Sequence, residues 1–260
     1  MSSKLILQET QGPCQTIILN RPDSRNAFNF ELAEALAEAV AQAGRDEKIK
    51  VVVLRGAGES FSAGGDLKLF HKNLDSSAEA FRRVTTHLNR AVSEIVSMPK
   101  PVIAAIQGPA YAAGFGVAMA CDLVVAGLNS KLSPSFVNIA LAPNASSTFF
   151  LPRLIGPRLA IEAFMTGRVF SATEAKELGM INHVWAEENF EEELSLLVEN
   201  LIHRPTTALG RMKKLIAASF RNSWHEQLEL EKKEISESSL ESNFKEGVSA
   251  FVEKRKPNFR

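Results

Sequence analysis

The stretch PVIAAIQGPAYAAGFGVAMAC, residues 101–121, decides how the chain folds. It carries no charged side chain, and Lys100 and Asp122 bound it on either side. Its length would be enough to cross a bilayer, but Gly108-Pro109 interrupts it and alanine and glycine make up much of it. The pattern instead predicts a buried strand over 101–106, a turn, and a buried helix of small residues at about 112–120.

Strands and amphipathic helices alternate on both sides of this stretch. Short apolar runs predict strands over 5–9, 16–19, 51–55, 102–106 and 123–126. Apolar side chains at helical spacing predict helices over 29–45, which Asn29 would cap, and 81–95. This alternation is typical of α/β architecture with parallel strand pairing.

The last part of the chain is predicted to be helical. After Val184 the sequence predicts no strand, and helices are expected over 190–203, 206–220, 224–240 and 244–254. The simplest division is therefore a core over residues 1–200 followed by a helical region over residues 201–260.

The composition is that of an ordinary globular protein. Of 260 residues, 45% are hydrophobic and 23% are charged, which is enough for a sizeable core and rules out a disordered chain. The 30 basic and 30 acidic side chains give a formal net charge of zero. This balance argues against a general affinity for nucleic acid or for an anionic membrane surface.

Cysteine usage and the chain ends favour a cytoplasmic protein. Cys14 and Cys121 are too few for a disulfide framework, which indicates a reducing compartment. The apolar run Leu5–Leu7 is too short for the core of a signal peptide. The final Asn258-Phe-Arg260 is not the Ser-Lys-Leu peroxisomal address.

Several catalytic and cofactor motifs are absent from the sequence. The five histidines form no His-Glu-x-x-His motif and neither cysteine has a Cys-x-x-Cys partner, so no metal site is expected. There is also no Gly-x-x-x-x-Gly-Lys loop and no Gly-x-Ser-x-Gly elbow. Gly114-Phe-Gly116 begins like a dinucleotide fingerprint, but Met119 holds the third glycine position. A Rossmann dehydrogenase is therefore a distant alternative.

Two glycine-rich segments carry the strongest functional signal. FSAGGDL (61–67) and GPAYAAGFG (108–116) each follow an expected buried strand and precede an expected helix. Small residues let backbone N–H groups approach a ligand closely. Side by side, the two loops would form an oxyanion hole for a carbonyl that gains negative charge. The alternative is a pair of tight turns with packing glycines.

Short motifs follow one another along nearly the whole chain. They are LNRP (19–22), Asn26-Ala27, FSAGGD (61–66), KPVIAAIQG (100–108), AMACD (118–122), LPRLIG (151–156), ATEAKELG (172–179), Glu246-Gly247, AFVEKR (250–255) and PNF (257–259). In this order and spacing the sequence resembles the crotonase superfamily, the enoyl-CoA hydratase/isomerase family. The resemblance implies an α/β fold in which a spiral of ββα units precedes a helical C-terminal region that joins subunits into a homotrimer or a dimer of trimers. It also implies a coenzyme A thioester as substrate, with no further cofactor.

The resemblance implies which residues bind this substrate. The backbone N–H groups of Gly65 and Ala113 match the pair that holds the thioester carbonyl. Positions along the coenzyme A groove are matched by Arg25, Ala27, Ala63, Asp66, Leu67 and Lys68. Two further residues match positions that reach coenzyme A from a neighbouring helix or subunit: Phe251 and Lys254.

The usual catalytic carboxylates of the family are replaced. The positions of the two hydratase glutamates hold Gly116 and Phe136, neither of which can move a proton, so hydration by the two-carboxylate route is not expected. Isomerases of the family and the chlorobenzoyl-CoA dehalogenase carry a single acid in a loop that matches residues 142–147. That position holds Asn144, whose amide cannot act as a general base. The neighbouring residues look more like the isomerase branch than like the hydratases.

Three functions are compatible with Asn144. The expected one is an enoyl-CoA isomerase that moves a double bond through a thioester enolate, with His71, Asp75 or a pocket water as the base. The others are a reaction that needs only the oxyanion hole and hydrogen bonds, and a catalytically silent coenzyme A thioester binder. Asn144 could also cap the next helix. Phe136 and Phe149 could line an acyl pocket or belong to the core.

Overall fold

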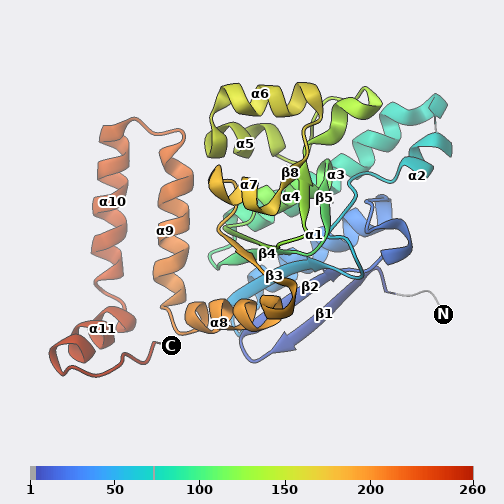
Figure 1. Ribbon diagram of the computed structural model, residues 1–260. Helices are drawn as coiled ribbons and strands as arrows, with labels where there is room; N and C mark the ends of the chain where they lie inside the picture. Colours follow the sequence, from blue (N-terminus) through green and yellow to red (C-terminus); the bar gives the residue numbers. More distant parts are fainter. Residues whose placement is uncertain (1–3, 73, 260) are drawn as a thin grey trace.

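The computed structural model describes residues 4–72 and 74–259, which form an α/β core followed by a helical arm (Figure 1). The strands of the core are β1 (Ile6–Gln11), β2 (Cys14–Leu19), β3 (Val51–Gly56), β4 (Val102–Ile106), β5 (Pro109–Tyr111), β6 (Leu123–Gly127), β7 (Lys131–Ser133), β8 (Phe170–Ser171) and β9 (His183–Trp185). Its helices are α1 (Phe30–Arg45), α2 (Leu67–Lys72), α3 (Ser77–Ser97), α4 (Ala113–Met119), α5 (Ser147–Ile155), α6 (Pro157–Thr166), α7 (Ala172–Glu177) and α8 (Phe190–Ile202).

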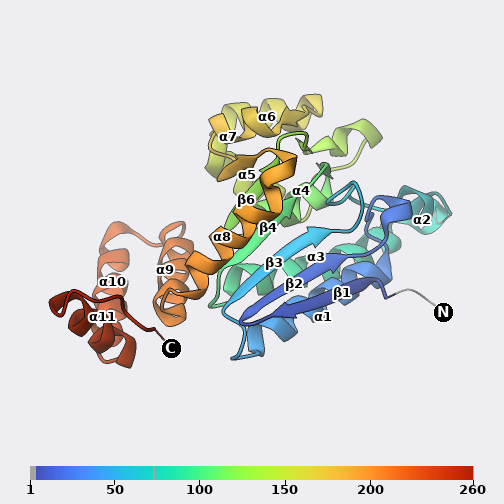
Figure 2. The ribbon, with the colours of Figure 1, turned by 60° about the horizontal axis from the view of Figure 1, so that its bottom comes forward.

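The main sheet has six strands in the order β1-β2-β3-β4-β6-β9. β1 and β2 form an antiparallel hairpin, and every following pair is parallel. The side chains of β3 alternate between two apolar clusters. Val52 and Leu54 pack in the large cluster with residues of α1 and α3, whereas Val51 and Val53 pack with Phe190 of α8. Figure 2 shows α8 in front of the sheet and α1 and α3 behind it. Burial on both faces explains the continuous apolar runs of these strands.

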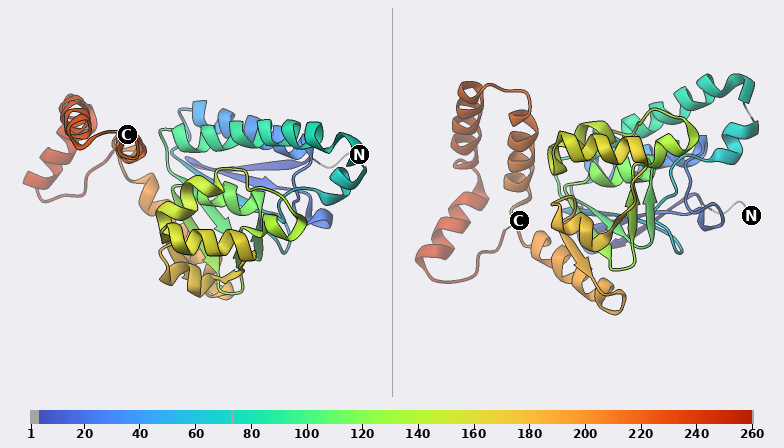
Figure 3. Two further views of the ribbon diagram at one scale, coloured as in Figure 1. Left: turned by 90° about the horizontal axis from the view of Figure 1, so that it is seen from above. Right: turned by 45° about the horizontal axis from the view of Figure 1, so that its top comes forward.

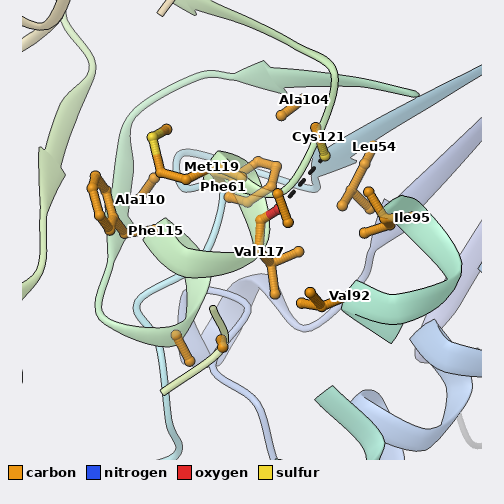
Figure 4. Close-up of a cluster of buried hydrophobic side chains, with 14 of the residues drawn as sticks. Leu54, Phe61, Val92, Ile95, Ala104, Ala110, Phe115, Val117, Met119 and Cys121 are labelled. Carbon is orange, nitrogen blue, oxygen red and sulfur yellow. Dashed lines mark hydrogen bonds between the residues drawn. The ribbon is translucent and has the colours of Figure 1, made fainter. Parts of the chain in front are cut away.

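A second, smaller sheet stands beside α4. It has three strands in the order β5-β7-β8, with β5 parallel to β7 and β7 antiparallel to β8. The seven residues of α4 are all buried, and Phe115, Val117 and Met119 belong to the large apolar cluster (Figure 4). The helix of small residues expected at 112–120 is thus confirmed, and in the described part of the chain no helix is long and apolar enough to span a membrane.

Three helices follow the core and stand to one side of it (Figures 1 and 3). They are α9 (Thr206–Ser219), α10 (Trp224–Ser238) and α11 (Ser242–Val252). Arg211 joins α9 to α10 through Glu234 at 2.6 Å and Glu237 at 2.9 Å. Large apolar side chains of this arm are exposed, among them Trp224, Leu228, Ile235, Phe244, Phe251 and Val252. The division at residues 200 and 201 and the assembly of trimers through this arm stay predictions.

The α/β class is confirmed, and most expected elements lie within a few residues of their predicted ends. Asn29 caps α1 as expected, since its side chain accepts a hydrogen bond from the Leu32 N–H at 2.9 Å. The sequence missed β5, β7, β8 and β9, which span two or three residues each. A strand so short has no detectable alternation of apolar and polar residues, and these four are defined by pairing with distant segments.

Lys213 of α9 fastens the arm to the core. Its Nζ donates to the carbonyl oxygens of Ile95 (2.6 Å) and Lys100 (3.3 Å) and to Asp122 Oδ2 (2.7 Å). Asp122 Oδ2 also accepts from the Val102 N–H at 2.8 Å. Burial raises the pKa of the Asp122 carboxyl above its ordinary value, and the Lys213 ammonium opposes that rise.

We expect Lys213→Met to lower the free energy of unfolding at pH 7 by about 2–3 kcal/mol, because Asp122 then stays partly buried without a countercharge. The pKa of Asp122 rises further in this variant, so acid protonates the carboxyl more readily in the folded than in the unfolded chain. The cost of the substitution therefore shrinks as the pH is lowered towards 4. Denaturant unfolding at several pH values measures both effects.

The matched control is Lys233→Met, which removes an exposed lysine of α10 at 3.9 Å from Glu237. An exposed pair contributes little, so this variant should differ from wild type by less than about 0.5 kcal/mol. Equal losses in the two variants would contradict the role assigned to Lys213.

Candidate active site

The two glycine-rich segments lie side by side and are joined by backbone hydrogen bonds. The Ser62 N–H donates to the Pro109 carbonyl at 3.1 Å, and the Tyr111 N–H donates to the Ser62 carbonyl at 2.9 Å. Gly64 has φ +92°, and a Cβ there would lie 2.8 Å from the Cβ of Ala112. Only glycine permits this approach of the two loops. The pair of loops predicted from the sequence is therefore present.

The backbone N–H groups of Gly65 and Ala113, from different loops, have no acceptor within the described part of the chain. Ala113 is the first residue of α4, where helical N–H groups have no partner inside the helix. Gly65 lies between two backbone hydrogen bonds, from Phe28 to Gly64 (2.7 Å) and from Asp66 to Phe28 (3.0 Å), and its own N–H is in neither. Gly65 and Ala113 both line the same cavity. Two free donors at one cavity wall are the arrangement that stabilises an oxyanion.

This cavity has a volume of about 460 Å³ and is mostly apolar. Its apolar side chains come from α2, α3 and the segment after β7, and they include Leu67, Phe70, Phe81, Val84, Leu88, Phe136, Ile139 and Leu141. Its polar side chains are Thr85, Ser135, Asn138 and Asn144. Within the described residues, no acid, histidine, lysine, cysteine or tyrosine lines the cavity.

Asn144 lies in the loop before α5 and faces α3. Its Nδ2 donates to Thr85 Oγ1 at 3.2 Å, and its Oδ1 is buried without a partner among the described residues. Its backbone carbonyl accepts from the N–H and the hydroxyl of Ser147, at 3.2 and 2.8 Å. The suggestion that the Asn144 side chain caps the next helix is wrong, since Ser146 holds the N-cap position of α5.

Sequence comparison agrees with this geometry. The sequence model of a family described as enoyl-CoA hydratase/isomerase matches residues 9–260. The chain belongs to the enoyl-CoA hydratase/isomerase family.

Similar members of the family differ in the reaction after which they are named. The chain is 35% identical to a 1,2-epoxyphenylacetyl-CoA isomerase of Escherichia coli strain K12, over 98% of both chains. It is 30% identical to a trans-2-decenoyl-[acyl-carrier-protein] isomerase of Streptococcus mutans, over 100% of this chain and 99% of that one. The crystal structure of an enoyl-CoA hydratase from Polaromonas sp. JS666 superposes with a TM-score of 0.94 at 33% identity, covering 98% of this chain and 99% of that one. The fold is therefore the crotonase fold.

The structure leaves no room for a side chain at Gly116, the residue that the resemblance matches to the first hydratase glutamate. A Cβ on Gly116 would lie 2.4 Å from the carbonyl oxygen of Ala145 and 3.0 Å from its Cβ. The loop that carries Asn144 thus packs directly on α4. Phe136, which the resemblance matches to the second glutamate, is buried and lines the cavity.

Helical glycines offer a matched test of this packing. We expect Gly116→Ala to lower the free energy of unfolding by about 1–3 kcal/mol, because the loop at Ala145 must move. Gly44→Ala in α1 is the control, since its Cβ would make an ordinary contact of 3.5 Å with Met98. That variant should gain about 0.5–1 kcal/mol from the helix propensity of alanine. Denaturant unfolding measures the free energy of unfolding of both variants. A Gly116→Ala protein more stable than wild type would contradict the close packing.

The residues expected along coenzyme A are neighbours in the structure. The Ala63 N–H donates to the Arg25 carbonyl at 2.9 Å, and Leu67 lines the cavity. The sequence did not indicate that Arg21, in the LNRP motif, contacts these residues. Its guanidinium donates to the Ala27 carbonyl at 2.5 Å and to Asp66 Oδ2 at 2.9 Å. Asp66 is thus held in place by an ion pair, while the Arg25 and Lys68 side chains are exposed.

Other expected residues lie away from the cavity. His71 and Asp75 are exposed and do not line it, so the structure supports neither as the base. Phe149 also lies outside it, and its ring packs edge-on against Phe220 of α9 with centroids 6.0 Å apart. Phe251 is 86% exposed on α11, and Lys254 follows that helix, on the far side of the molecule from α2 (Figure 1). Their contact with coenzyme A bound to a neighbouring subunit stays a prediction.

Proposed function

We propose that the protein is an enoyl-CoA isomerase that moves a double bond within the acyl group of a coenzyme A thioester. The observation that carries the proposal is the pair of free N–H groups, at Gly65 and Ala113, on the wall of an apolar cavity. Such donors favour a reaction whose transition state places negative charge on the thioester oxygen.

The reaction proceeds through an enolate. A proton leaves C2 of a 3-enoyl thioester, the C–H electron pair forms a C1–C2 double bond, and the carbonyl electrons move onto the oxygen bound by Gly65 and Ala113. The dienolate is then protonated at C4, which leaves a 2-enoyl thioester. Since the described cavity lining has no titratable side chain, water carries the proton between C2 and C4.

Isomerisation is favoured over hydration by the residues at the acid positions. Gly116 and Phe136 cannot activate a water molecule for attack on C3. Two of the similar proteins are named as isomerases, one for a coenzyme A thioester and one for an acyl carrier protein thioester. We further expect a cytoplasmic homotrimer or dimer of trimers, assembled through the C-terminal arm, with no cofactor beyond the thioester itself.

Turnover of defined thioesters tests the proposal. Purified protein is expected to convert cis- and trans-3-hexenoyl-CoA into 2-hexenoyl-CoA with saturation kinetics, and to add no water to 2-hexenoyl-CoA. Saturated hexanoyl-CoA should inhibit competitively. Binding of hexanoyl-CoA without any turnover would contradict isomerisation and favour a silent thioester binder. Absence of thioester binding would contradict the assignment of the site.

A further inference from the structure

Asn144 and Thr85 form a polar pair in the cavity. They come from different elements, the loop before α5 and the helix α3, and both line the cavity. The contact between them, from Asn144 Nδ2 to Thr85 Oγ1, measures 3.2 Å. It uses one donor of the amide and leaves the amide oxygen free.

Each member of the pair keeps unused hydrogen-bonding capacity, which for Asn144 includes the second Nδ2 hydrogen as well as the oxygen. Asn144 Oδ1 is a buried acceptor without a donor in the described part of the chain. The Thr85 hydroxyl accepts from Asn144, and no described residue accepts its hydrogen. The next residue along α3 behaves differently, because the Thr86 hydroxyl donates to the Arg82 carbonyl at 2.8 Å. Thr85 therefore keeps a donor for the cavity where Thr86 does not.

A buried acceptor left without a partner costs free energy in the folded chain. Most side chains that line the cavity are apolar, so an entirely hydrocarbon acyl chain offers neither group a partner. A hydroxyl group is the smallest substituent that satisfies both, because it donates one hydrogen bond and accepts another. A carbonyl or an ether oxygen could accept from Thr85 but would leave Asn144 Oδ1 unpaired.

We propose that the acyl group of the natural thioester carries a hydroxyl group, which donates to Asn144 Oδ1 and accepts from Thr85 Oγ1. Asn144 and Thr85 are then specificity-determining residues. The inference rests on the proposed function, because it places the acyl chain of a coenzyme A thioester in this cavity. It assigns the substrate class within that function: hydroxylated rather than plain enoyl thioesters.

Calorimetric titration of saturated probes, which cannot isomerise, tests the inference. The probes are hexanoyl-CoA, its 3-, 4- and 5-hydroxy derivatives, and the O-methyl ether of each derivative. We expect at least one hydroxy derivative to bind wild type about tenfold more tightly than hexanoyl-CoA. Its methyl ether should show no such advantage, since it has no hydrogen to donate.

Three variants identify the groups that recognise the hydroxyl. Thr85→Val and Asn144→Leu keep the side-chain shapes but remove the polar atoms, so both should lose the preference while still binding hexanoyl-CoA. Thr86→Val, one residue further along α3, should keep it. The unliganded Asn144→Leu protein should be at least as stable as wild type, because it no longer buries an unpaired acceptor. A purely structural role for Asn144 predicts the opposite change in stability.

The outcomes separate the inference from the proposed function. Equal binding of hexanoyl-CoA and every hydroxy derivative by wild type would overturn the inference and leave the proposed function standing. A preference that persists in Thr85→Val, or that the methyl ether shares, would also overturn it. If no probe bound at all, the result would contradict both the inference and the proposed function.

Discussion

Ala113→Pro is expected to lower kcat for 3-hexenoyl-CoA about 10²–10³-fold, because it removes one of two N–H groups proposed to bind the enolate oxygen. Ala113 is the first residue of α4, where proline is tolerated because the missing N–H has no helical acceptor. Ala112 before it has φ 47° and ψ −117°, outside the extended region to which proline restricts its predecessor, so Ala112 must shift in this variant. Cooperative unfolding in denaturant is therefore needed to show that the fold is kept.

The control for this variant is Ala113→Gly, which keeps the N–H and removes only a methyl group. Its kcat should stay close to that of wild type, and both variants should unfold cooperatively in denaturant. Binding of saturated hexanoyl-CoA, measured separately, shows how much of the loss arises from the added proline ring. Equal kcat values for the two variants would contradict an oxyanion hole at Ala113.

The pairing of the two glycine-rich loops could be predicted because its signal is local. Each of the two loops is a contiguous run of small residues between a buried strand and a helix, and the structure brings the two runs together through Ser62, Pro109 and Tyr111. The strands at the centre of the main sheet were predictable for a similar reason. Both of their faces are covered, so β3 and β4 are continuous apolar runs whatever their neighbours are.

The parts that sequence did not predict depend on contacts between distant residues. Thr85 lies 59 residues from Asn144 in a helix whose pattern shows only an amphipathic surface. Arg21 and Asp66 are 45 residues apart, and nothing in either neighbourhood indicates the other. The sequence left Phe149 open between an acyl pocket and the core, and its packing against Phe220 depends on where α9 returns to the core. An aromatic side chain by itself carries no information on that point.

Asn144→Asp is expected to raise kcat for 3-hexenoyl-CoA about 10²–10⁴-fold, the contribution that a well-placed general base makes. The structure already supplies the other requirements. The apolar cavity around residue 144 would raise the pKa of a carboxyl, and the free Thr85 hydroxyl could donate to it. The carboxylate would replace an amide of nearly the same size, so the loop that packs on Gly116 need not move.

The pH dependence identifies the new base. In Asn144→Asp, kcat/KM should rise with pH and level off, with a midpoint above the ordinary aspartate pKa of about 4, because only the ionised carboxyl accepts a proton. Wild type should lack this rise of kcat/KM with pH. The control is Asn138→Asp, which changes the other asparagine of the cavity lining, an exposed residue. Asn138→Asp should show neither the rise in kcat nor the new rise of kcat/KM with pH.

The size of the gain bears on how wild type moves the proton. If water is the carrier, Asn144→Asp replaces a weak base by a strong one and the rate rises steeply. If wild type and Asn144→Asp turn over equally fast, a proton carrier outside the described cavity lining already performs this step. That outcome would contradict the water route and direct the search to groups that reach the cavity from another subunit, beginning with the exposed side chains of α11.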